Sequence, residues 1–109
     1  MAFIAEELAL ELVKKVREPV EMIQKRDRDL ASQIRRATNS VVSNLSEGAQ
    51  RVGQDRMHHY RISAGSAAEL RSALRVASAW GYVNEERLDE SMVLVRRVLA
   101  IVWKLTHPR

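Results

Sequence analysis

Apolar residues recur every three or four positions along nearly the whole chain, and this spacing restricts the fold more than any other feature. The clearest stripe is Leu30, Ile34, Ala37, Val41 and Leu45. Residues three or four apart share one face of an α-helix, whereas a half-buried strand alternates at every second residue. Only four Gly and two Pro occur among the 109 residues, too few for the frequent turns of a β-sandwich or barrel. The pattern predicts an all-α protein.

The periodic segments divide the chain into four predicted helices, and its length suits one domain, residues 1–109. We expect helices at about 3–25, 29–47, 54–80 and 84–105. The segments between them are short, and short connections force neighbouring helices to reverse direction. The prediction is therefore an antiparallel, up-down-up-down four-helix bundle.

Several residues mark where these helices begin, end or bend. Pro19 lies inside the first segment, where a proline removes one backbone hydrogen bond and crowds the preceding turn, so we expect a kink or a restart there. The other signals are an N-cap at Asp27 or Asp29, a left-handed stop at Gly48, an end at Gly81 and an N-cap at Asn84.

Apolar residues exceed what a lone bundle can bury, most clearly in the fourth segment. Between Met92 and Leu105, eleven of fourteen residues are apolar. One stripe suffices for the core and consists of Leu88, Met92, Val95, Leu99, Val102 and Leu105. Large exposed apolar patches usually mark an interface, so we expect a homo-oligomer; the alternative is a monomer with an unusually apolar surface. The interface candidates are Val93, Leu94, Ile101, Trp103 and Trp80.

Positive charge is concentrated in the middle of the chain. The chain has 18 Lys and Arg against 14 Asp and Glu, a net charge of +4. Residues 30–80 hold seven of these cations, all arginine, and three of the acids, so this part accounts for the whole imbalance. Arginine binds phosphate and carboxylate groups with a planar fork of donors. The cluster indicates an anionic partner, with a solvated helix face as the alternative.

The sequence offers little support for catalysis. It contains no Cys, which excludes disulfides and thiol chemistry. No Glu-x-x-His pair of the di-metal bundles occurs, and no spacing indicates a catalytic triad. We therefore expect a non-enzymatic protein with no metal and no cofactor. The longest apolar run, Val98–Trp103, is too short to cross a bilayer, and the default expectation is a cytoplasmic protein with no membrane partner.

Two local motifs resemble a known family. The first runs from Gln33 to Gly48 and includes Ser40-x3-Asn44-x2-Glu47-Gly48; the second runs from His59 to Tyr82 and includes Gly65-Ser66-x2-Glu69. Together they resemble the 23S rRNA intervening-sequence proteins, small bacterial proteins encoded within large-subunit rRNA genes and elsewhere. They are also similar to the accessory variability determinants of diversity-generating retroelements. Leu45-Ser46 replaces the usual Ile-Ala of the family.

The resemblance implies an antiparallel four-helix bundle that assembles as a homopentameric ring, often with a basic surface. In the retroelement branch it implies binding to nucleic acid and to a reverse transcriptase. The role of the intervening-sequence branch is unsettled, and a shared fold does not by itself assign a function.

The motif residues predict a polar network where the second and third helices cross. Ser40, Asn44 and Glu47 share one edge of the second helix, and Ser66 and Glu69 share one face of the third. A buried carboxylate must be paired, so such a network would fix the register of the helices. A ligand or catalytic site is the alternative.

The predicted function is binding of an RNA or DNA backbone by an arginine-rich face. The candidates, on the second helix and around the following loop, are Arg35, Arg36, Arg51, Arg56 and His58. Aromatic residues are scarce there, which predicts phosphate contacts with little reading of bases. The alternative function is a scaffold that binds an acidic protein or a nucleic-acid enzyme such as a reverse transcriptase.

Overall fold

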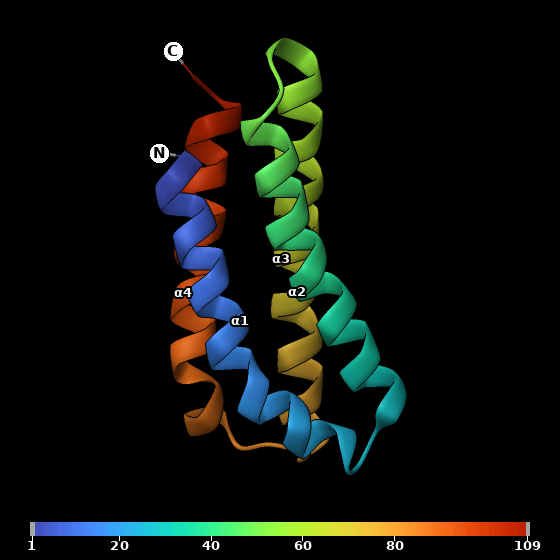
Figure 1. The fold of residues 1–109 in the computed structure, drawn as a ribbon. Coiled ribbons are helices and arrows are strands. Elements are labelled where there is room, and N and C mark those ends of the chain that lie inside the picture. The colour runs from blue at the N-terminus through green and yellow to red at the C-terminus, as the bar shows by residue number, and fades with distance from the viewer. Residues whose placement is uncertain (1, 109) are drawn as a thin grey trace.

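The computed structural model describes residues 2–108, and within them it contains four helices and no strand. The helices are α1 (Ala2–Gln24), α2 (Arg28–Ala49), α3 (Gly53–Ala79) and α4 (Glu85–Thr106). They form an elongated bundle of 42 × 22 × 19 Å (Figure 1). The predicted all-α class and the four segments are confirmed, with boundaries that differ by one or two residues.

Each helix packs against two others: α1 and α3 each contact both α2 and α4. The three connections are short and lie at the ends of the bundle, and the N- and C-terminal ends of the chain lie together at one of these ends (Figure 1). We call this the terminal end. The opposite end, which contains the α1–α2 and α3–α4 connections, is the loop end.

The core consists of two adjoining clusters of buried side chains. The stripe predicted on α2, from Leu30 to Leu45, is buried throughout. On α4 the prediction was wrong in detail, because Leu94 and Val98 are buried while Met92 and Leu99 lie at the edge of the core. Since α4 packs against both α1 and α3, its buried arc is wider than the single stripe we assigned to it.

The end signals are confirmed with one exception. The Asp27 carboxylate accepts a hydrogen bond from the Leu30 amide at 2.9 Å, and the Asn84 side chain accepts one from the Arg87 amide at 3.1 Å. Gly81 ends α3 with a φ of 81°. The exception is Gly48, which lies inside α2; the residue in the left-handed region at this corner is Gly53, with a φ of 61°.

Pro19 does not restart the first helix, since α1 continues from Ala2 to Gln24. A proline at this position cannot donate a hydrogen bond to the carbonyl of Lys15, four residues earlier. That carbonyl accepts one instead from the Ser91 hydroxyl of α4, at 3.1 Å. Ser91 is only 1% exposed. A buried polar residue of α4 thus satisfies the group that the proline leaves free in α1.

This arrangement predicts energetic coupling between Pro19 and Ser91. In the wild-type chain, Ser91→Ala leaves the Lys15 carbonyl unpaired and should lower the free energy of unfolding by about 1–2 kcal/mol. In a Pro19→Ala background, the new amide at position 19 can bond this carbonyl, so Ser91→Ala should cost clearly less. Urea unfolding of the four proteins measures the coupling; equal costs in both backgrounds would contradict this account.

Candidate nucleic-acid interface

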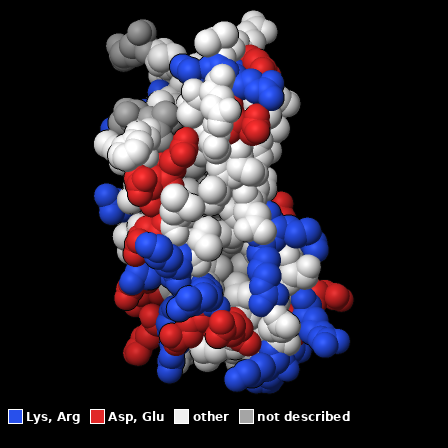
Figure 2. Space-filling view, viewed as in Figure 1, with Lys and Arg blue, Asp and Glu red and all other residues white. Residues whose placement is uncertain are grey.

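A groove of about 480 Å³ runs between α1 and α2 on the face shown in Figure 2. Its apolar lining comes from Val13, Val16 and Val20, spaced so that they follow one side of α1. The polar and charged residues that complete the lining are Lys14, Arg17, Glu21, Arg35, Thr38 and Asn39. The groove thus has an apolar floor and a mainly basic rim.

The two rim arginines form no ion pair with a carboxylate of the described residues. Within the described part of the chain, no carboxylate oxygen lies within 4.0 Å of the guanidinium nitrogens of Arg17 or Arg35. Lys14 lies 3.7 Å from Glu11 across an exposed pair, and Glu21 is the acidic residue of the rim. In Figure 2, Lys and Arg gather on both sides of an uncharged band toward the loop end.

Arg35 and Arg36, predicted from the sequence, are both exposed on α2. Arg36 donates a hydrogen bond to the Ser32 hydroxyl one turn earlier, at 2.7 Å. The prediction omitted Lys14 and Arg17, because their segment, residues 2–24, has three cations against five acids. Their spacing of three residues, which places them on one side of a helix, was the signal that could have found them.

Arg51 and Arg56 have structural partners. Arg51 bridges the two helices of the α2–α3 corner, with one nitrogen 3.1 Å from Glu47 and the other 2.8 Å from Asp55. Its hydrogen bond holds the pKa of the Asp55 carboxyl below its usual value. Arg56 donates to the carbonyls of Gly48 and Ala49, at 3.0 and 3.3 Å, and so caps the end of α2. Because of these contacts, neither guanidinium is as available to a ligand as that of Arg35.

The same corner depends on a close approach between Gly48 and Tyr60. A Cβ atom at Gly48 would lie 2.5 and 2.6 Å from two carbons of the Tyr60 ring, which is 2% exposed. Only glycine fits such a contact without movement of the ring. His58, the remaining candidate on this part of α3, is exposed, and its ring contacts that of His59 edge-on.

Three of the five residues of the predicted polar network meet between α2 and α3. The Ser40 and Ser66 hydroxyls lie 2.7 Å apart across the helix crossing. The Asn44 amide donates to the Ser40 carbonyl and hydroxyl, at 2.9 and 3.2 Å. Its carbonyl oxygen then faces His59 Nδ1 at 3.0 Å, so that this nitrogen is the donor.

Glu47 and Glu69 lie outside this cluster, and both are exposed. Two residues that we did not predict complete the crossing: His59, and Ser63, whose buried hydroxyl donates to the Val41 carbonyl at 2.9 Å. The positions 59, 63 and 66 have helical spacing, which could have placed all three on one face. Every buried polar side-chain atom of the described residues has a hydrogen-bond partner.

The interface candidates lie at different levels along the length of the bundle. Trp103 is 60% exposed near the terminal end and Val93 is 47% exposed midway, while Ile101 is half-buried. Trp80 is 68% exposed at the loop end, about 30 Å away along the helix axis. Leu94 faces inward and belongs to the core. A single patch therefore cannot include both tryptophans.

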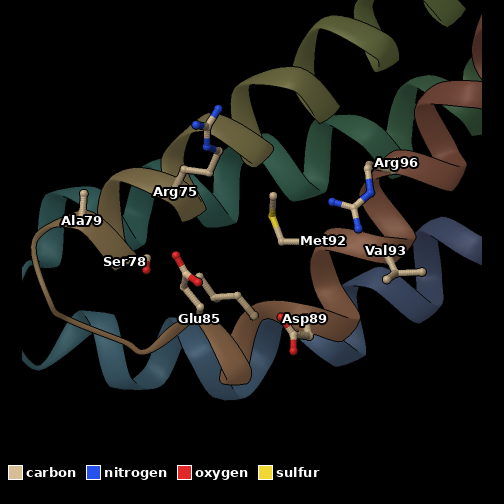
Figure 3. Close-up of a pocket in the computed structure, with 9 residues that line it drawn as sticks. Arg75, Ser78, Ala79, Glu85, Asp89, Met92, Val93 and Arg96 are labelled. Atoms are coloured by element: carbon tan, nitrogen blue, oxygen red, sulfur yellow. The ribbon is translucent and has the colours of Figure 1, made fainter.

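A second hollow, of about 730 Å³, lies on the surface between α3 and α4 and is shown in Figure 3. Met92 lies between Arg75 of α3 and Arg96 of α4, and Glu85 and Asp89 are at the α4 side (Figure 3). The mixture of charges gives this hollow no preference for anions or cations. Among residues 2–108, no group of three potential metal ligands occurs, and no helix has the length and hydropathy to span a bilayer.

Comparison with known proteins identifies the sequence pattern. Residues 3–104 match the family described as 23S rRNA-intervening sequence protein. No curated protein matches the chain. A crystal structure of a protein of unknown function, from the S23 ribosomal protein family of Bacteroides thetaiotaomicron, is similar with a TM-score of 0.85 and 17% identity. The alignment covers 95% of this chain and 99% of that one, and at this identity it supports the fold alone.

The glycines of α2 and α3 provide a matched test of the corner. Gly48→Ala should lower the free energy of unfolding by about 1–3 kcal/mol, because the added methyl group overpacks against Tyr60. Gly65→Ala, in the middle of α3 with open space around a Cβ, should raise it by about 0.5–1 kcal/mol. Thermal or urea unfolding measures both. A neutral Gly48→Ala would contradict the close approach.

Proposed function

Because the chain belongs to the 23S rRNA-intervening sequence protein family, whose function is unknown, we propose its role from its own surfaces. We propose that it is a non-enzymatic, cytoplasmic, homo-oligomeric bundle that binds the phosphate backbone of nucleic acid. The binding surface is the exposed face of α2 together with the rim of the α1–α2 groove. We call this surface the basic face; it comprises Lys14, Arg17, Arg35, Arg36 and Asn39.

The observation that supports this function most directly is the pairing state of the arginines. Arg17 and Arg35 have no carboxylate within ion-pair distance among the described residues, whereas Arg51 is held between two. A guanidinium without a protein partner can give both of its donor edges to a phosphate. An arginine already bridging Glu47 and Asp55 must first break those contacts.

The chemistry of the basic face favours backbone binding over sequence recognition. Lys and Arg neutralise phosphates regardless of the bases, and the release of counterions makes such binding strongly dependent on salt. Asn39, exposed at the groove, adds a neutral hydrogen-bonding group that can contact sugars or phosphates. We therefore expect weak discrimination between sequences.

Assembly would multiply this modest local charge. We propose that the helices are antiparallel, as their short connections require, and that five chains form a ring, the assembly that the family resemblance implies. The exposed apolar residues Val93 and Trp103 of α4, with Phe3 and Ile4 of α1, form the surface that would be covered. Five copies of the basic face would then act on one polyanion with a high effective concentration.

A second candidate function rests on the groove floor. Three valines of α1 give the groove an apolar lining beneath its basic rim. An amphipathic helix with an acidic face complements that combination, because it can bury apolar side chains while its carboxylates meet the rim. Such a helix would belong to an acidic partner protein.

Substitution of one arginine at a time tests the proposed face. Arg35→Gln should weaken binding to labelled RNA and duplex DNA about tenfold at low salt. It should also lower the slope of log K against log salt on duplex DNA by about 0.9 for each copy whose Arg35 contacts a phosphate. Arg51→Gln removes the same charge from an arginine with two protein partners and should leave affinity nearly unchanged. Equal effects of the two variants would contradict the assignment, and no wild-type binding at low salt would favour the acidic protein partner.

The tryptophans test the proposed assembly. Sedimentation of the wild-type chain at micromolar concentration should give about five times the mass of a single 12.4 kDa chain. Trp103→Asp places a charge in the proposed interface and should reduce that mass, whereas Trp80→Asp, at the loop end, should not. A monomeric wild-type protein would contradict the proposal.

A further inference from the structure

An exposed aromatic stack lies at the loop end of the bundle. The rings of Trp80 and Tyr82 are nearly parallel, with an interplanar angle of 14° and centroids 6.3 Å apart. The guanidinium carbon of Arg26, from the α1–α2 connection, lies 5.6 Å from the centroid of the Tyr82 ring. Tyr82 is half-buried, but Trp80 is 68% exposed. A large flat ring is thus supported from within the protein and open to solvent.

The backbone that carries this ring has a defined conformation. Trp80 is the C-cap residue of α3, and its amide donates a hydrogen bond to the Val76 carbonyl at 3.0 Å. Gly81 then takes up a left-handed conformation, which lets the Tyr82 amide reach the Ala77 carbonyl at 3.0 Å. Val83, the next residue, is buried in the core. The backbone of the turn is therefore fixed on both sides, so that little backbone entropy remains to be lost when a ligand stacks on the ring.

Cations and acids both lie near the stack, and the acids include Glu85 and Glu86 in the first turn of α4. The α1–α2 connection supplies Lys25, Arg26 and Arg28, and a shallow hollow of about 400 Å³ lies among its side chains. Of its two acids, Asp27 is used as the N-cap of α2 and Asp29 lies in the first turn of that helix. Lys and Arg are prominent at this end in Figure 2, together with Asp and Glu.

We propose that the loop end binds an unpaired nucleobase of single-stranded nucleic acid. The base stacks on the exposed face of Trp80, while Lys25 and Arg28 contact the flanking phosphates. This inference rests on the proposed function and extends it, because the basic face alone contacts only the backbone. Every base has a π-face, so the site should accept different bases.

The basic face and the loop end are continuous along α2. Arg28 begins that helix and Arg35 follows seven residues later, a separation of about 10 Å along the axis. The cations of the loop end therefore continue along α2 onto the basic face. Paired bases in a duplex have no free face to stack, so the loop end should favour unpaired segments.

The experiment uses a Trp103→Phe variant of the full chain, in which Trp80 is the sole tryptophan. A short oligouridylate should quench its fluorescence, and an abasic oligomer of the same length and charge should not. In binding assays with the oligouridylate, Trp80→Ala should weaken affinity about 5- to 150-fold, the range measured for loss of one base–aromatic stack. Trp80→Phe keeps an aromatic ring and should retain most of the affinity. Duplex DNA should bind all three proteins alike.

The experiment distinguishes failure of the stacking site from failure of backbone binding. Equal affinity for the abasic and base-bearing oligomers, unchanged in Trp80→Ala, would overturn the stacking site but leave backbone binding intact. Absence of binding to every oligomer at low salt would overturn both. A blue shift of Trp80 emission that grows with protein concentration alone would show that a second copy covers the ring, which also overturns the stacking site. Circular dichroism and sedimentation of each variant verify fold and assembly.

Discussion

The close packing of α2 against α3 is the contact on which the rest of the molecule depends. It requires small or hydrogen-bonded residues at the crossing: Ser40 meets Ser66, Ser63 bonds the Val41 carbonyl, and Gly48 admits the Tyr60 ring. These contacts fix how α2 is rotated about its own axis. Because Arg35 lies on the opposite side of that helix, the rotation also determines where this part of the basic face points.

Two pairs of arginines differ in their protein partners. Arg51 and Arg56 join the end of α2 to the start of α3 through carboxylates and backbone carbonyls. Arg17 and Arg35 have no such partner among the described residues and border an open groove. Net charge alone cannot separate these groups. Arg17 and Arg35 are available for phosphate, and the proposed nucleic-acid surface, from Arg28 to Asn39, spans more than half of α2.

Much of the fold could be predicted because helical periodicity depends on local spacing. The stripe of α2, the caps at Asp27 and Asn84 and the end at Gly81 all follow from residues within one or two turns. The errors concern contacts between distant segments. Leu94 is buried because α4 touches two helices, and Gly48 lies inside α2 because Tyr60 packs on it. The pairing of Arg51 depends on how the α2–α3 corner closes, and the stacking of Trp80 on Tyr82 depends on the turn at Gly81. Periodicity does not report on either geometry.

The hydrogen bond from Ser91 to the Lys15 carbonyl also determines the register of α1 on α4. Within a regular helix nearly all carbonyls are already bonded to an amide four residues later. The carbonyl opposite Ser91 is free only because residue 19 is proline. If α1 slid by one turn, Ser91 would face an occupied carbonyl and the Lys15 carbonyl would lose its partner. A proline and a serine 72 positions apart thus distinguish one alignment of the two helices from its neighbours, which valines and leucines repeated along both helices would not do alone.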